Sequence, residues 1–186
     1  MIYKLLLNFL EIIEKNVWGK VGKSGDFVVT LNPNIFKSVK MRFLGNIEAK
    51  ADSKGRVFLP AVFRKEIQQA EEVRLVMRKD VFEDCLVLFP ESVWNQRLDA
   101  LRQRLSEWNA VHQRIYRQYV SGVEIVALDA NGRFLIPKRY MQMAGINQDV
   151  MFIGMGDTIE IWSREKTAVP FVEPADFRSQ LEQLMG

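Results

Sequence analysis

Two arginines in this chain of 186 residues each follow a tight glycine turn, at the same place in a repeated nine-residue pattern. Residues 52–60 read DSKGRVFLP and residues 129–137 read DANGRFLIP, so the arginines are Arg56 and Arg133. Arginine presents a planar fork of N–H donors that matches guanine O6 and N7 or a phosphate group. The repeat therefore predicts two equivalent binding groups and favours a repeated binding surface over a single catalytic cleft.

Each turn also carries an aspartate and a glycine, which are Asp52 and Gly55 in the first copy and Asp129 and Gly132 in the second. The Asn-Gly dipeptide of the second copy is typical of a tight turn whose central residues need positive φ. A carboxylate cannot approach phosphate favourably, so we expect the aspartates to hold the turn or orient the arginine. A second interpretation is that each arginine only pairs with a carboxylate on a solvated turn, and the residues alone do not separate the two.

Further basic residues lie close to both copies of the pattern. They are candidate contacts to nucleic-acid phosphates, and they comprise Lys54, Arg64, Lys138 and Arg139. Phosphate contacts position a protein on a duplex without reading its sequence. The alternative is that these are ordinary solubility charges.

The repeat extends beyond the nine residues. Runs of β-branched and aromatic residues bounded by Gly, Asp and Asn predict strand, turn, short strand, short helix and two more strands in each unit. In the first unit these elements fall at about 43–51, 56–59, 61–68, 73–79 and 85–89. In the second they fall at about 121–128, 133–136, 138–143, 149–155 and 158–162.

A unit of roughly 45 residues is small for a core of its own. Two units that interleave their strands can share one core, so the pattern favours a mixed β/α fold built around a pseudo-twofold β-barrel. Residues 90–119 predict a pair of helices with a break near Ser106–Trp108, because apolar residues recur there at helical spacing. Residues 176–185 predict one more short helix.

The composition favours a soluble, intracellular protein, with 48% apolar residues, a formal charge of +3 and a pI near 9.0. This mild basicity suits a polyanionic partner without proving one. The single Cys85 and single His112 cannot assemble a His/Cys metal site, and we interpret them as a buried apolar residue and a surface residue. No nucleotide-binding or catalytic pattern is present. We therefore expect no enzyme activity, no cofactor, no metal and no membrane partner.

The duplicated Asp-x-x-Gly-Arg turn resembles the AbrB-like, swapped-hairpin DNA-binding fold. Two tandem copies, with LVLFPESVW from Leu86 after the first and GDTIEIW from Gly156 ending the second, resemble the MraZ family over Met41 to about Lys166. The resemblance implies two AbrB-like units in a double-split β-barrel. It also implies a bacterial transcriptional regulator of the division and cell-wall gene cluster, which binds direct repeats in its own promoter, forms rings and localises to the nucleoid.

Carried onto this chain, the DNA-contacting arginines of that family correspond to Arg56 and Arg133, and Asp52 and Asp129 complete the motif. The predicted domains are unit one at 41–90, a helical connector at 91–119, unit two at 120–166 and a C-terminal tail at 167–186. The alternative function is a ring-forming scaffold or antitoxin-like interaction protein whose arginine turns face another acidic partner.

Residues 1–40 precede the duplicated part. Residues 18–26 can be encoded, if Val21 is GTG, Ser24 is AGT and Gly25 is GGG, by DNA in which TGGG recurs at intervals of about ten bases, close to one turn of B-DNA. This favours the hypothesis that the segment is translated operator DNA and that the true start is Met41. The alternative is an amphipathic helix within 1–15 followed by a Gly/Lys-rich linker.

Overall fold

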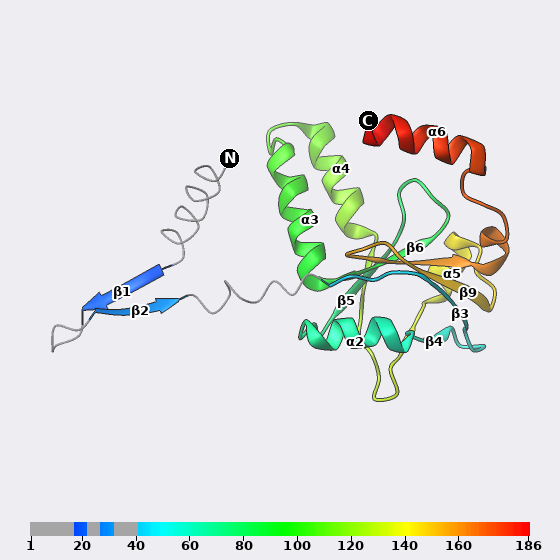
Figure 1. Ribbon diagram of the computed structural model, residues 1–186, viewed down its shortest axis with the longest axis horizontal. Coiled ribbons are helices and arrows are strands. Elements are labelled where there is room, and N and C mark those ends of the chain that lie inside the picture. Colours follow the sequence, from blue (N-terminus) through cyan, green and yellow to red (C-terminus); the bar gives the residue numbers. More distant parts are fainter. Residues whose placement is uncertain (1–16, 22–26, 32–40) are drawn as a thin grey trace. The chain divides into compact units, whose positions relative to one another are not determined.

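The computed structural model describes residues 17–21, 27–31 and 41–186, and it divides the chain into two units, Met1–Lys40 and Met41–Gly186 (Figure 1). In the first unit, β1 (Val17–Val21) pairs antiparallel with β2 (Phe27–Leu31). The described part of the predicted linker is therefore a strand. The helix considered for residues 1–15 lies outside the described residues, and the operator hypothesis stays a prediction.

The duplication predicted from the sequence is confirmed in the second unit, because the two halves contain the same elements in the same order. The first half contains β3 (Asn46–Lys50), β4 (Arg56–Phe58), α2 (Ala61–Gln69), β5 (Leu75–Lys79) and β6 (Leu86–Pro90). The second half contains β7 (Val123–Val126), β8 (Arg133–Leu135), α5 (Lys138–Ala144), β9 (Asp149–Gly154) and β10 (Ile159–Ser163). Pro60 and Pro137 immediately precede α2 and α5, as expected for residues that need no N–H at a helix start.

The two halves exchange strands. The antiparallel six-stranded sheet has the order β3-β9-β10-β6-β5-β7, so the first strand of each half pairs with a strand of the other half. Replacing each strand by its counterpart in the other half (β3 by β7, β5 by β9, β6 by β10) gives the same order read in reverse. A pseudo-twofold axis therefore lies between β10 and β6. A second, two-stranded sheet pairs β4 with β8. The predicted interleaving is thus confirmed, and the closed barrel stays a prediction.

The core lies where the halves meet. All five residues of β6 are buried, because this strand is central in the sheet and is covered on both faces. Phe43 packs edge-on against Phe63 of α2 at 5.6 Å, and Phe134 of β8 packs against Phe152 of β9 at 6.3 Å between ring centroids. Burial of each such ring contributes about 1.5–3 kcal/mol. The contact between Phe134 and Phe152 therefore joins the two-stranded sheet to the six-stranded sheet.

The predicted helical pair is α3 (Glu91–Arg104) and α4 (Ala110–Ser121), which Figure 1 shows as an antiparallel hairpin. The break predicted near Ser106–Trp108 is confirmed. Asn109 caps α4, since its side chain accepts hydrogen bonds from the N–H groups of Val111 and His112. Trp94 stacks on Tyr119 at 5.3 Å and joins the two helices. A short 3₁₀ turn, η2 (Arg164–Thr167), and α6 (Pro174–Met185) complete the chain.

Candidate nucleic-acid interface

The first arginine turn is a closed cage of hydrogen bonds around Asp52. One carboxylate oxygen of Asp52 accepts the backbone N–H groups of Lys54 and Arg56, each at 2.9 Å. The other oxygen accepts Nε and Nη2 of Arg56, each at 2.7 Å. Gly55 completes the turn at φ +86°, a conformation that side chains rarely adopt. The aspartate therefore holds both the turn and the direction of the guanidinium group.

The second turn repeats this cage around Asp129. One oxygen accepts the N–H groups of Asn131 and Arg133, and the other accepts Nε of Arg133, all at 2.9 Å, while Gly132 has φ +78°. In both turns the backbone N–H of the arginine is the main cause that lowers the pKa of the aspartate below its usual value. Both carboxylates are consequently ionised near neutral pH and stay engaged with their arginines.

Pairing of β4 with β8 places the two arginines on one ribbon. The register sets Arg56 opposite Leu135, Val57 opposite Phe134, and Phe58 opposite Arg133. The central pair is buried, whereas the residues of the outer two pairs point away from the core. Since side chains alternate across a strand, both arginines project from the same outward face. The structure thus brings together two groups that are far apart in sequence.

Each half braces the turn of the other half. The N–H of Ile136 donates to the carbonyl of Gly55 at 2.9 Å, and the N–H of Leu59 donates to the carbonyl of Gly132 at 3.0 Å. A methyl group on Gly55 would lie 2.5 Å from the Ile136 carbonyl oxygen and 3.2 Å from the sulfur of Met141. On Gly132 it would collide with the side chain of Arg64. Each turn is therefore supported by contacts from the other half.

The four predicted phosphate contacts fall in different surroundings. Lys54 is exposed on the first turn, and Lys138 is exposed at the first residue of α5. Arg64 lies on α2 and donates to the Asn131 carbonyl at 2.9 Å, so its guanidinium group is used to brace the second turn. Arg139 pairs with Glu124 of β7 at 2.5 Å. The two lysines are therefore the better placed for contact with phosphate.

Two apolar residues on the ribbon were not among the predicted site residues. Phe58 and Leu135 are 54% and 50% exposed, although each belongs to a strand whose central residue is buried. The guanidinium carbon of Arg133 lies 5.6 Å from the centre of the Phe58 ring. The alternation Arg-Val-Phe after Gly55 carries the signal, because a buried Val57 requires Phe58 to point outward beside Arg56.

Cys85 and His112 take no part in this interface. Cys85 is buried in the core, and burial raises the pKa of its thiol far above the usual value. His112 is half-buried, and its Nδ1 accepts the N–H of Ser106 at 2.9 Å, which closes the turn between α3 and α4. Among the described residues, no group of three or more His, Cys, Asp or Glu side chains could hold a metal ion. Within the same residues, no helix combines the length and apolarity needed to span a membrane.

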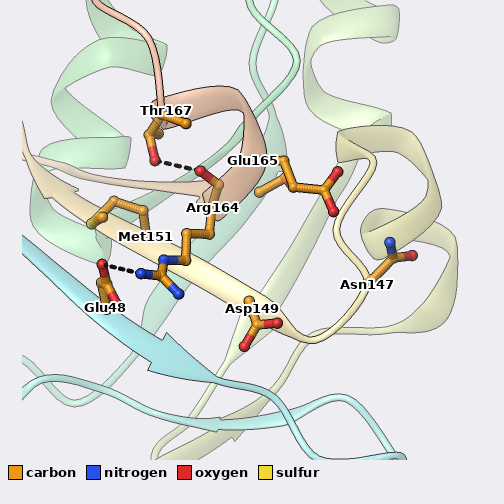
Figure 2. A pocket seen from close by; sticks show the side chains of 9 residues that line it. Glu48, Asn147, Asp149, Met151, Arg164, Glu165 and Thr167 are labelled. Carbon is orange, nitrogen blue, oxygen red and sulfur yellow. Dashed lines mark hydrogen bonds and ion pairs between the residues drawn. The ribbon is translucent and has the colours of Figure 1, made fainter.

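A separate cleft of about 470 Å³ lies at the β3 end of the six-stranded sheet, between β3, β9 and η2. Figure 2 shows Glu48 directed at Arg164, where an ion pair of 3.1 Å is made, with Asp149 and Glu165 on the walls. Thr167 donates to the carbonyl of Arg164 at 2.9 Å. Three carboxylates against one guanidinium group give the lining a net negative charge, which disfavours phosphate, so this cleft does not extend the arginine ribbon.

Strand exchange and the arginine ribbon together define a class of protein with two β/α units, in which each unit contributes one caged arginine to a shared surface. The family described as "MraZ protein, putative antitoxin-like" matches residues 42–118 and 120–166. The chain belongs to this family. The resemblance predicted from the two motif copies is thereby confirmed.

Several curated proteins are similar to most of this chain. The transcriptional regulator MraZ of Phocaeicola vulgatus is 61% identical over 146 residues, which cover 78% of this chain and 95% of that protein. The protein of the same name from Bacteroides fragilis is 61% identical over 145 residues, covering 78% and 92%. That from Bacteroides thetaiotaomicron is 59% identical over 146 residues, covering 78% and 94%.

Proposed function

We propose that this chain is a sequence-specific, DNA-binding transcriptional regulator that reads DNA through Arg56 and Arg133. The observation that carries the proposal is the pair of matching cages, which hold both guanidinium groups on one outward ribbon face. A two-stranded ribbon fits the major groove of B-DNA. The relatives named as transcriptional regulators support the same role.

The aspartates prepare the arginines for binding without contacting DNA themselves. Asp52 engages the Nε and Nη2 edge of Arg56, which leaves Nη1 free of this ion pair for an acceptor on a base. Because the side chain is already held in place, less conformational entropy is lost on binding. Phe58 and Leu135 flank the arginines and present apolar surface of the kind that contacts thymine methyl groups. Lys54 and Lys138 contact phosphates.

The wider proposal follows the family. The two sheets are the layers of an AbrB-like double-split barrel, and copies of the chain assemble into a closed ring. In the cytoplasm, at the nucleoid, the ring binds direct repeats of TGGG type in its own promoter, ahead of division and cell-wall genes. Repeats about one helical turn apart present the same groove face to adjacent copies.

The test is a binding titration with a duplex that carries three TGGG repeats at ten-base spacing, against a duplex with the repeats scrambled. Arg56→Ala and Arg133→Ala should each weaken binding by about 1–3 kcal/mol per site engaged and relax base preference. Arg74→Ala is the matched control, since Arg74 makes a similar two-point ion pair with Glu91 away from the ribbon. It should bind like the parent.

Unchanged affinity and base preference in the double arginine variant would contradict the proposal. An assembled protein that shows no preference between the two duplexes would instead favour the second function, a ring-forming scaffold or antitoxin-like interaction protein. This second function is supported by the family description, which contains the words "antitoxin-like".

A further inference from the structure

The C-terminal helix α6 covers nothing in the single chain, although it is amphipathic. Every residue from 168 to 186 is exposed. Phe177, Leu181 and Leu184 recur at helical spacing and are 56%, 45% and 84% exposed. Figure 1 shows α6, in red, set apart from the sheet and joined to it by the segment after β10. A helix of twelve residues is marginal by itself in water, so its apolar face calls for a partner.

A second helix, α4, also leaves apolar side chains uncovered in the single chain. None of its residues is buried, and Val111 and Ile115 are 53% and 50% exposed one turn apart. Ile115 lies on the wall of a groove of about 810 Å³ between α4, α5 and the end of β5. The apolar part of that groove is lined further by Tyr119, Tyr140 and Met143. This volume accommodates several side chains of an incoming helix.

The two helices carry opposite charge. In α4 the charged residues are Arg114 and Arg117, with no acidic residue, whereas Glu173 and α6 together contain three acidic residues and one arginine. Among the described residues, Arg114 and Arg117 form no ion pair, and neither does Asp176. Unpaired charges of opposite sign thus flank two uncovered apolar faces, which is the complementarity expected of an interface.

Arg78 of β5 lies beside this groove and combines a cation–π contact with a buried, unpartnered hydrogen-bond donor. Arg78 lies over the ring of Tyr119, with 4.0 Å between its guanidinium carbon and the ring centre. Its Nη1 is buried and has no hydrogen-bond partner among the described residues. A buried donor without an acceptor costs about 1–3 kcal/mol. Arg78 also lines the groove beside Arg114 and adds positive charge to its wall, which favours an acidic occupant.

We propose that α6 of one copy packs along α4 and into this groove of a second copy. Leu181 is placed centrally against Ile115, and the acidic residues of α6 face Arg114 and Arg117. Both helices belong to the same unit of the chain, and yet the single chain leaves both faces uncovered. The occupant is therefore a second copy. Since the contact joins unlike surfaces, it repeats head to tail and closes into a ring where the rotation allows.

The inference rests on the self-assembly included in the proposed function and names the contact that makes it. The experiment uses two full-length variants, Leu181→Asp and Ile115→Asp. Leu181 and Ile115 are 45% and 50% exposed in the single chain, so each variant should fold, as circular dichroism and thermal unfolding will verify. The first variant has a damaged α6 and an intact groove, and the second has the reverse.

By sedimentation velocity at tens of micromolar, the parent should assemble and each variant alone should be a monomer. An equimolar mixture of the variants should form a heterodimer and nothing larger, because it contains only one intact pairing of α6 and groove. Val73→Asp is the matched control. Val73 is 84% exposed and lies on neither helix, so this variant should assemble like the parent.

Variants that assemble like the parent would overturn the α6 contact, and so would monomeric variants that fail to associate on mixing. A parent that is monomeric under these conditions would overturn ring assembly itself. The arginine titration reports on DNA reading separately, since its substitutions lie on the ribbon and not on α4 or α6.

Discussion

The two arginine turns share one hydrogen-bonding scheme and differ in what packs against them. Each aspartate accepts two backbone N–H groups and the Nε of its arginine, so the cage itself is duplicated faithfully. Around the cage, the first turn meets the Ile136 carbonyl and Met141, while the second meets the guanidinium group of Arg64. The geometry of the turn is therefore local, and its support comes from the other half.

The arginines differ in the same way. The side chain of Arg56 is 43% exposed and contacts Asp52 through two nitrogens. That of Arg133 is 29% exposed, contacts Asp129 through Nε, and lies over the ring of Phe58. Two copies of one motif have thus become unequal because their neighbours are unequal. We expect Arg133 to depend on the ribbon and Arg56 to depend mainly on its own turn.

The largest effect is expected from substitutions of the two turn glycines. Alanine at Gly55 or Gly132 would be forced into positive φ, which costs about 1–3 kcal/mol. At Gly132 the added methyl group meets only the flexible end of Arg64, whereas at Gly55 it meets a backbone carbonyl that cannot rotate away. Gly55→Ala should therefore lower the free energy of unfolding more than Gly132→Ala, as measured by urea denaturation at one protein concentration.

The role of Arg64 provides the control for this comparison. Adding Arg64→Ala should recover part of the stability lost in Gly132→Ala and none of that lost in Gly55→Ala, because only the second turn meets this side chain. Equal losses for the two glycine variants, or equal recovery, would show that the turns do not differ in their supports.

A smaller effect should distinguish the two arginines. Phe58→Ala removes the ring beneath Arg133, and a cation–π contact at an exposed site is worth about 0.5–1 kcal/mol. In double-mutant cycles on DNA affinity, Phe58 should couple to Arg133 by about this amount and be nearly additive with Arg56. Coupling of similar size to both arginines would contradict the proposed dependence of Arg133 on the ribbon.

The smallest effect concerns the flanking basic residues. Lys54→Ala and Lys138→Ala should each reduce the slope of log affinity against log salt concentration by about 1, as expected for the loss of one phosphate contact. Arg139→Ala should leave the slope unchanged, because its guanidinium group is held by Glu124. If Arg139→Ala reduced the salt slope as much as the lysine variants do, the ion pair between Arg139 and Glu124 would have to open on DNA binding.

Much of the fold could be predicted because the same motif and the same order of elements occur twice in the sequence. Runs of β-branched and aromatic residues with Gly and Pro boundaries predicted the strands and helices of both halves, since backbone conformation at such boundaries is decided locally. The expectation of positive φ at both Asn131 and Gly132 was wrong, because among the described non-glycine residues only Glu71 has positive φ and Gly132 alone adopts it in this turn. The break between α3 and α4 was likewise visible in the spacing of apolar residues. Membership of the family followed from the order of the same motifs.

Other features depend on residues that lie far apart in the sequence. The sequence alone determined that Arg56 and Arg133 follow similar turns, because Asp, Gly and Arg at this spacing close a turn by themselves. Only the tertiary structure decided that Arg64 braces Asn131, that Arg139 pairs with Glu124, and that Phe58 lies beneath Arg133. These partners are brought together by strand exchange, and the pairing of β4 with β8 is a long-range contact that no local pattern encodes.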